Sequence, residues 1–193
     1  MQLKMLNDQE LISSYLCGNQ SAFEVLLKRY KDKIYTSIYL FVKDTELAED
    51  IFQDVFIKII DTLKKEKYNN EGKFLQWGMR IAYNMCVDHF RKSKRMSKIS
   101  NNETFDIFSV LECKDDHMEK SIIKSQVHTK LRDLIDQLPD EQREVVILRH
   151  YADMSFKEIS MMTRVSINTS LGRMRYALIN LRKMVTEDEL VMQ

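Results

Sequence analysis

The chain is poor in the two residues on which the turns of β-rich proteins depend. Its 193 residues include only four glycines and one proline. An all-β fold needs frequent tight turns, and such turns draw heavily on these residue types. Charged residues make up 31% and hydrophobic residues 44% of the chain, as expected for a soluble, mainly helical protein. The composition therefore predicts an all-α fold.

Groups that could carry catalysis or hold a metal are sparse and scattered. Cys17, Cys86 and Cys113 are too few and too far apart for a disulfide framework or a Cys-x-x-Cys metal pair. The histidines are equally dispersed, at His89, His117, His128 and His150. No phosphate-binding loop, dinucleotide fingerprint, nucleophile elbow or His-Glu-x-x-His motif occurs. The sequence thus predicts a protein that is not an enzyme and that has no cofactor or metal.

Long apolar segments are also missing. No hydrophobic run approaches the ~20 residues that a helix needs to cross a bilayer. The opening segment, MQLKMLNDQE, becomes acidic at once and has no apolar stretch suited to a signal peptide. We therefore expect a cytoplasmic protein.

The most distinctive segment spans residues 155–183 and predicts two helices joined by a tight turn. Ser155 and Glu158 have the spacing of a capping box, in which two side chains satisfy the free N–H groups of a helix start. Ser166 is a second candidate N-cap and would begin a helix that ends near Leu181. A helix–turn–helix of this kind places its second helix in the major groove of DNA. From Arg164 onward the segment holds five basic residues and no acidic one, although the chain as a whole is nearly neutral.

Turn signals and hydrophobic periodicity divide the chain into two helical domains joined by a linker. Residues 1–95 predict a helical bundle, and residues 126–193 predict a second helical domain that contains the helix–turn–helix. Residues 96–125 are polar and acidic, break the helical period, and are expected to form a flexible linker.

Helix starts and stops are predicted from local signals. In the first domain we expect helices over 8–18, 21–40, 46–65 and 74–95, with a capping box at Ser21 and Glu24 and a start at Asp44 or Thr45. In the second domain we expect a helix over 126–138 and another that Pro139 opens and that runs through residue 151, since proline suits a first turn.

The helix expected over 46–65 has two contrasting faces on a helical wheel. Its core side carries Ala48, Ile51, Val55, Ile59 and Leu63. The opposite side carries Glu46, Asp50, Gln53, Ile57, Ile60 and Asp61, with Asp54 at its edge. Two isoleucines among acids suit a surface that docks on a partner. Packing of these isoleucines against a neighbouring helix of the same domain is an equally open alternative.

The helix expected over 74–95 carries a mainly basic face. Its members recur at spacings of three or four residues: Arg80, Asn84, Asp88, Arg91 and Arg95. Trp77 and Tyr83 lie beside this face, and Lys92 extends it. Basic groups interleaved with aromatic rings suit a phosphate backbone with unstacked bases. The alternatives are a solvated helix with a charged tail and, for Trp77, a place in the core.

The sequence pattern of the last expected helix predicts an inner face and an outer face. The inner face comprises Ile167, Ser170, Met174, Leu178 and Leu181. The outer face comprises Asn168, Thr169, Gly172, Tyr176 and Lys183, flanked by Arg173 and Arg175. Such a mixture combines groups that read base edges with groups that hold phosphates. A glycine in mid-helix lowers helix stability by about 1 kcal/mol relative to alanine. Close approach of the helix backbone to DNA at Gly172 would explain why the glycine is tolerated.

The order of these features resembles the extracytoplasmic-function (ECF) group of the sigma-70 family of bacterial RNA polymerase sigma factors. The resemblance covers about residues 19–95 and 126–183. It is carried by AEDIFQDVFIKI (48–59), FLQWGMRIAYNMCVDHFRK (74–92), LPDEQREVVILRHYADMSFKEIS (138–160) and the helix that follows. It implies that the first domain corresponds to conserved region 2 and the second domain to conserved region 4.

The resemblance also implies partners and site residues. Core RNA polymerase would bind Asp50, Gln53, Asp54 and the neighbouring Ile57 through the clamp helices of its β′ subunit. The loop 67–73 and the helix that follows would melt and read the −10 promoter element, with Trp77, Arg80, Asn84, Asp88, Arg91, Lys92 and Arg95 as candidate contacts. The helix–turn–helix would read the −35 element through Asn168, Thr169, Gly172, Arg173, Arg175, Tyr176 and Lys183, and would also face the β flap. The linker would thread toward the RNA exit path.

The chain departs from the family pattern at the helix–turn–helix. The family often has glycine in the turn, where this chain has Arg164, and valine and lysine where it has Ser170 and Leu171. Base preferences therefore do not transfer. No zinc-binding inhibitor motif is fused, so any anti-sigma factor would be a separate protein. The alternatives are a stand-alone helix–turn–helix regulator that binds an operator, and a helical nucleotide-processing enzyme, which lacks any metal or nucleophile cluster.

Overall fold

The structure, a computed structural model, describes residues 2–65, 67–69, 72–97 and 131–191. Within these ranges the regular structure is entirely helical and contains no strand, which confirms the predicted all-α class. The chain divides into two compact units, Met1–Val110 and Leu111–Gln193. Most of the linker expected over 96–125, from residue 98 onward, lies outside the described residues. No helix in the described ranges is long and apolar enough to span a membrane.

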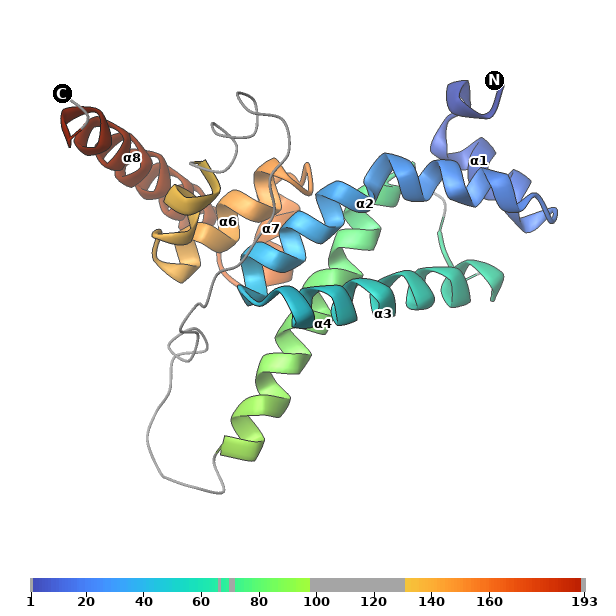
Figure 1. The fold of residues 1–193 in the computed structure, drawn as a ribbon, viewed down its shortest axis with the longest axis horizontal. Helices are drawn as coiled ribbons and strands as arrows, with labels where there is room; N and C mark the ends of the chain where they lie inside the picture. Colours follow the sequence, from blue (N-terminus) through green and yellow to red (C-terminus); the bar gives the residue numbers. More distant parts are fainter. Residues whose placement is uncertain (1, 66, 70–71, 98–130, 192–193) are drawn as a thin grey trace. The chain divides into compact units, whose positions relative to one another are not determined.

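The first unit is a helical bundle organised around one long helix. The 3-10 helix η1 (Gln2–Met5) and α1 (Asp8–Leu16) precede α2 (Gln20–Val42), and α3 (Thr45–Lys64) and α4 (Phe74–Ser97) follow it. Helix α2 packs against η1, α1, α3 and α4, and α3 also packs against α4 (Figure 1). The loop between α3 and α4 starts at the end of α3 and leads into the buried Phe74.

The core of this unit includes the predicted side of α3. The five apolar residues expected there are all buried, at 5% exposure or less: Ala48, Ile51, Val55, Ile59 and Leu63. They recur every three or four residues, which places them on one side of a helix that turns once every 3.6 residues. The remaining side of α3 is thereby left to face solvent.

Helix α2 begins differently from the prediction. It starts at Gln20, one residue before Ser21, so the predicted capping box of Ser21 and Glu24 is wrong. Asn19 occupies the N-cap position without a side-chain hydrogen bond to the helix, and its amide donates instead to Ser14 Oγ at 3.1 Å. Ser21 lies two residues after the N-cap position, inside the first turn, and so does not cap the helix.

Two other helix starts of this unit are capped by side chains. Asn7 and Glu10 form a capping box at α1, where Asn7 Oδ1 accepts from the Glu10 N–H at 2.9 Å and the Glu10 carboxylate accepts from the Asn7 N–H at 2.8 Å. Asp44 caps α3, as predicted, by accepting from the Leu47 N–H at 3.0 Å.

The second unit contains the expected helix–turn–helix. Residues 131–136 are helical, followed by α6 (Asp140–His150), α7 (Phe156–Thr163) and α8 (Ile167–Val191). Helix α8 packs against both α6 and α7. Pro139 occupies the N-cap position of α6 rather than its first turn. Helix α8 continues to Val191, well past its predicted end near Leu181.

A buried arginine joins the start of this unit to α6. Arg143 is only 4% exposed. Its guanidinium pairs with Asp140 and donates to the carbonyl oxygens of Asp136 at 3.2 Å and Leu138 at 3.5 Å. A buried charge is tolerated only where partners replace its lost hydration, and these groups do so. Arg143 thus fixes the turn that leads into α6.

Candidate nucleic-acid and partner interfaces

The outer face of α3 combines acids with an exposed isoleucine. Asp50, Gln53 and Asp54 are exposed, and Ile57 is 64% exposed. Ile60, which was expected on the same face, is only half-exposed. The face therefore consists of one apolar side chain rimmed by polar groups, an arrangement typical of a small docking surface.

The outer face of α4 extends from Arg80 through most of the helix. Arg80, Asn84, Asp88, Arg91 and Lys92 are all exposed, whereas the Arg95 side chain lies outside the described residues. Arg91 forms an ion pair with Asp88 at 3.6 Å, with both side chains more than half exposed. Such exposed pairs contribute little, about 0–1 kcal/mol, so Arg91 stays available to a phosphate group.

Trp77 occupies a half-buried position at the start of α4. Its ring lies 4.4 Å from that of Tyr68, in the loop between α3 and α4, and 5.7 Å from that of Phe74, measured between centroids. The indole is therefore fixed by packing yet keeps part of its surface in solvent. Tyr83, which was predicted beside the same face, packs instead against Phe41 of α2 at 5.6 Å.

The helix–turn–helix is closed by caps at both sides of its turn. Ser155 and Glu158 form the predicted capping box of α7. Arg164 ends α7 in the left-handed region with φ of 59°, a conformation that glycine adopts more readily. Ser166 then caps α8 by accepting from the Thr169 N–H at 3.0 Å. The local signals for this motif were thus read correctly.

The outer face of α8 exposes most of the predicted side chains. Asn168, Thr169, Arg175 and Lys183 are exposed, and Tyr176 is 61% exposed. The Thr169 hydroxyl also hydrogen-bonds to Ser166 Oγ at 2.8 Å, so part of its capacity serves the cap. A Cβ added at Gly172 would meet nothing within 4 Å. The helix backbone is consequently accessible at this point.

Arg173 differs from the other predicted side chains of the outer face. Its guanidinium forms ion pairs with Glu141 at 3.0 Å and Glu144 at 3.7 Å, both on α6, and its side chain is only 18% exposed. Glu144 is 13% exposed, so this pair is partly desolvated. The placement engages Arg173 within the domain, where it joins α8 to α6.

The predicted inner face of α8 needs a correction. Ile167 and Leu178 are each 45% exposed, whereas Ser170 and Ala177 are fully buried. Small residues let α8 approach the rest of the unit closely, and the larger apolar residues are left at the edge of the contact. The helix therefore packs along a line rotated from the one that hydrophobicity alone suggests.

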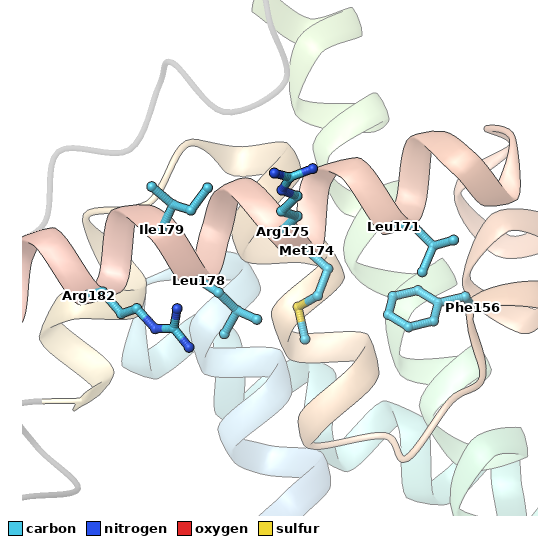
Figure 2. Close-up of a pocket in the computed structure, with 7 residues that line it drawn as sticks. All are labelled: Phe156, Leu171, Met174, Arg175, Leu178, Ile179 and Arg182. Carbon is cyan, nitrogen blue, oxygen red and sulfur yellow. The ribbon is translucent and has the colours of Figure 1, made fainter.

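Leu178 is one of several apolar residues that line a groove that was not predicted from the sequence. It has a volume of about 470 Å³ and is lined by Phe156, Leu171, Met174, Arg175, Leu178, Ile179 and Arg182. Figure 2 shows Leu171, Met174 and Leu178 extending from one side of α8, with Phe156 at the end of the row. Phe156 is held by the Arg149 guanidinium, which lies 5.3 Å from its ring centroid. The spacing of three and four residues from Leu171 to Leu178 was the available sequence signal.

The described part of the chain shows neither a metal-binding cluster nor a reactive buried thiol. No group of three or more His, Cys, Asp or Glu side chains that could hold a metal occurs there. Burial raises the pKa of the Cys86 thiol to about 12, which makes it an unreactive core residue at neutral pH.

Comparisons with known families agree with this division of surfaces. The family described as Sigma-70 region 2 matches residues 26–96, and the family described as Sigma-70, region 4 matches residues 128–174. The first match contains the outer faces of α3 and α4. The second contains the helix–turn–helix up to Met174.

Relatives match this chain over most of their own length. The chain is 27% identical over 174 residues to the ECF RNA polymerase sigma factor SigW of Bacillus subtilis, covering 88% of this chain and 92% of that protein. It is 26% identical over 175 residues to the RNA polymerase sigma-H factor of Pseudomonas aeruginosa, covering 86% and 87%.

Solved structures share the fold. The sigma factor RpoE from Bartonella quintana, solved with the anti-sigma factor NepR, matches with a TM-score of 0.66 at 17% identity, over 85% of this chain and 96% of that one. CnrH, solved with the cytosolic domain of CnrY, matches with a TM-score of 0.60 at 21% identity, over 94% and 98%.

Proposed function

The chain belongs to the ECF group of the sigma-70 family and is a non-enzymatic RNA polymerase sigma factor, and we propose that its exposed faces divide the work of promoter recognition. In this proposal the chain binds core RNA polymerase and brings it to promoters with defined −10 and −35 elements. The chemistry of RNA synthesis stays with the polymerase. The operator-binding regulator considered above is not favoured, because region 2 occupies residues 26–96.

The observation that carries the proposal is the presence, in one chain, of two surfaces with complementary tasks. Within the residues that match region 2, Ile57 is exposed among acidic side chains on α3. Within and just beyond those that match region 4, α8 exposes side chains of the kinds that contact DNA. A protein that only binds an operator needs the second surface and has no use for the first. A factor that joins polymerase to DNA needs both.

We assign the outer face of α3 to core polymerase. Asp50, Gln53 and Asp54 are exposed around Ile57, which supplies the apolar centre that a docking surface requires. The family resemblance implies the clamp helices of the β′ subunit as the surface that they meet.

We assign the start and outer face of α4 to the −10 element. Arg80, Arg91 and Lys92 supply positive charge for phosphates, and Asn84 adds a group that can hydrogen-bond to a base edge. Trp77 offers a rigid aromatic surface beside the loop between α3 and α4, on which an unpaired base can stack. Asp88 lies on the same face, where it orients Arg91 through their ion pair.

We assign the outer face of α8 to the −35 element. Asn168 and Arg175 are placed to reach base edges, and Lys183 to contact a phosphate group. Gly172 lets the helix backbone approach the DNA, with Thr169 and Tyr176 at its sides. Arg173 leaves this set, because its ion pairs with α6 already engage its guanidinium.

We further propose that the apolar groove of α7 and α8 receives a helix from a protein partner. The resemblance implies the β flap of the polymerase as one partner. Proteins of the same fold have been solved with separate binding proteins, one of them the anti-sigma factor NepR. A separate anti-sigma factor that competes for surfaces of this chain is therefore part of the proposal. Action on polymerase also implies a cytoplasmic location.

Reconstitution with core polymerase tests this function. The purified chain is mixed with bacterial core polymerase that has been freed of its own sigma factors. We expect the two to co-migrate in gel filtration and to start transcription at discrete sites in run-off assays on genomic fragments. The DNA sequences upstream of these start sites, when aligned, should share two motifs at a fixed spacing. DNA binding without core polymerase, combined with no transcription in its presence, would instead identify a stand-alone regulator.

A further inference from the structure

The loop between α3 and α4 is anchored by an aromatic cluster. Tyr68 lies in the loop, and its ring contacts those of Trp77 at 4.4 Å and Phe74 at 6.2 Å. Phe74, the first residue of α4, is 1% exposed. The positions of Tyr68 and Trp77, which border the proposed base-binding surface, therefore depend on how Phe74 is held.

Helix α2 contributes the residue that holds Phe74 from behind. The Tyr30 ring lies 5.6 Å from the Phe74 ring between centroids. The Tyr30 hydroxyl donates to Asp8 Oδ2 at 2.6 Å, across 22 residues of sequence. The ring of Tyr30 is thus fixed at one end by packing and at the other end by a hydrogen bond to a charged acceptor, which is stronger than a neutral one.

Asp8 is itself held by a second strong contact. Arg29 Nη1 pairs with Asp8 Oδ1 at 2.5 Å, and Arg29 Nη2 donates to the Leu6 carbonyl oxygen at 3.0 Å. The Asp8 side chain is only 15% exposed. The carboxylate therefore connects the start of α1 to two consecutive residues of α2.

The start of α1 also lies near the α4 end of the loop. Asn7, Asp8 and Gln9 line one hollow of about 410 Å³ together with Arg29 and Gly72. A Cβ added at Gly72 would lie 3.7 Å from the Gln9 side-chain nitrogen, and Gly72 has a φ of +72° that other residues rarely adopt. The α4 end of the loop is consequently close to the segment 7–9.

We propose that Asp8 and Tyr30 act as positioning residues for promoter opening, because the series of contacts Asp8–Tyr30–Phe74 holds Tyr68 and Trp77 in the arrangement that captures an unpaired −10 base. This inference rests on the proposed assignment of α4 to the −10 element. The region 2 match begins at residue 26, so Asp8 and the whole of α1 lie outside it. The N-terminal helix thereby gains a role in the DNA-binding step without contacting DNA itself.

The test measures binding of −10 DNA by holoenzyme assembled from the full chain and core polymerase. The probe is a fluorescent single-stranded oligonucleotide that carries the −10 element of a promoter transcribed by the wild-type holoenzyme. The variants are Asp8→Asn and Tyr30→Phe, each of nearly unchanged size. We expect each variant to bind the probe about five- to tenfold more weakly, a loss within the range that one hydrogen bond typically accounts for. Affinity for core polymerase should stay within about twofold of wild type.

The double variant and a matched control separate positioning from general stability. Asp8→Asn combined with Tyr30→Phe should lose less than the sum of the two single losses, since both changes act on the Asp8–Tyr30 hydrogen bond, while Asp8→Asn also weakens the ion pair with Arg29. The control is Glu24→Gln, which breaks an exposed ion pair with Lys28 on the same helix α2 and should leave probe binding unchanged. Wild-type probe affinity for Tyr30→Phe, measured below its unfolding temperature, would overturn the proposal. So would losses that simply add in the double variant.

The same experiment distinguishes failure of this inference from failure of the proposed function. If the wild-type holoenzyme does not bind the probe, or if Trp77→Ala leaves its binding intact, the −10 assignment of α4 is wrong. If Trp77→Ala weakens binding while both Asp8→Asn and Tyr30→Phe leave it unchanged, the −10 assignment stands and the positioning role is excluded.

Discussion

The guanidinium of Arg173 in α8 lies 3.0 Å from the carboxylate of Glu141 in α6. It also pairs with Glu144 at 3.7 Å, and the Glu144 side chain is only 13% exposed. Two carboxylates from one helix thus hold a single cation of another. This relationship separates Arg173 from its neighbour Arg175, which is exposed.

Arg173→Met should lower the stability of the second unit rather than its affinity for DNA. Methionine keeps the apolar stem but removes the cation that pairs with Glu141 and with the largely buried Glu144, at a cost of about 1–3 kcal/mol in unfolding free energy. Arg175→Ala should leave stability within about 0.5 kcal/mol of wild type and should weaken binding to the −35 element by about 1–3 kcal/mol, as expected for a lost base contact. Urea unfolding and binding titrations over a range of salt concentrations measure both. A stable Arg173→Met variant with a reduced salt slope would return Arg173 to the DNA contacts.

Replacing Asp50, Gln53 and Asp54 together by alanine should weaken binding to core polymerase without changing the helical circular dichroism, since all three are exposed. Ile57→Ala should cost about 2 kcal/mol of binding free energy if this side chain is the apolar centre of the surface. Asp32→Ala on α2, which is also exposed, serves as the matched control. Unchanged affinity of the triple variant in a pull-down would reject the assignment of this face.

Trp77→Ala should impair opening of the −10 element more than formation of the closed complex. Stacking of a base on an aromatic ring is worth about 1–3 kcal/mol, and only the open complex uses it. Permanganate reactivity of unpaired thymines reports opening, and gel shifts report closed-complex formation. Tyr83→Leu, which alters a half-buried aromatic of the same helix that packs on Phe41, is the control. Equal loss of opening in both variants, with a lowered unfolding temperature, would favour a purely structural role for Trp77.

Sequence periodicity predicted the buried side of α3 because that helix fills its core side with large apolar residues. On α8 it placed Ser170 correctly on the inner face but missed Ala177, a second small residue that is fully buried. A hydrophobicity pattern gives most weight to large apolar side chains. Packing also depends on how closely two helix backbones approach, and small residues allow a closer approach. Ile167 and Leu178 were therefore assigned to the core and lie at its edge.

Contacts between residues far apart in the sequence are the second feature that could not be predicted from the sequence. The helix–turn–helix is fixed by local caps, which lie three residues apart and can be read directly from sequence. The roles of Arg173 and Tyr30 depend on carboxylates supplied by other helices, Glu141 and Asp8. Nothing in the local pattern of α8 or α2 specifies these partners, so their contribution becomes visible only in the fold.

The Tyr30 hydroxyl predicts a specific loss of stability in alkali. Burial, and next the hydrogen bond to Asp8, raise the pKa of Tyr30 to about 12 from its ordinary value of 10.0. A group whose pKa is raised on folding stabilises the protein below its unfolded pKa and loses this contribution as pH rises through the folded pKa. The difference in unfolding free energy between wild type and Tyr30→Phe should therefore be full at neutral pH and shrink between pH 10 and about 12. A difference that stays constant over this range would contradict the assignment.

Gly172 provides the test of how closely α8 approaches DNA. A side chain at this position would meet no atom of the protein within 4 Å. Gly172→Ala should thus stabilise the helix by about 1 kcal/mol, the difference in helix propensity between the two residues. Gly172→Arg should also fold well, because its long side chain projects into open space. Thermal unfolding of the free protein measures both effects.

Recognition of the −35 element should respond in the opposite direction to stability. Arginine at residue 172 fills the space between the α8 backbone and the groove, so Gly172→Arg holoenzyme should lose transcription from the native promoter or change its tolerance of −35 substitutions. Thr186→Arg adds the same charge to an exposed position farther along α8 and should leave both unchanged. Because the added charge is equal, a difference between the two variants reports the local contact and not general attraction to phosphate. Wild-type transcription by Gly172→Arg with an unaltered −35 preference would show that this face of α8 does not meet DNA.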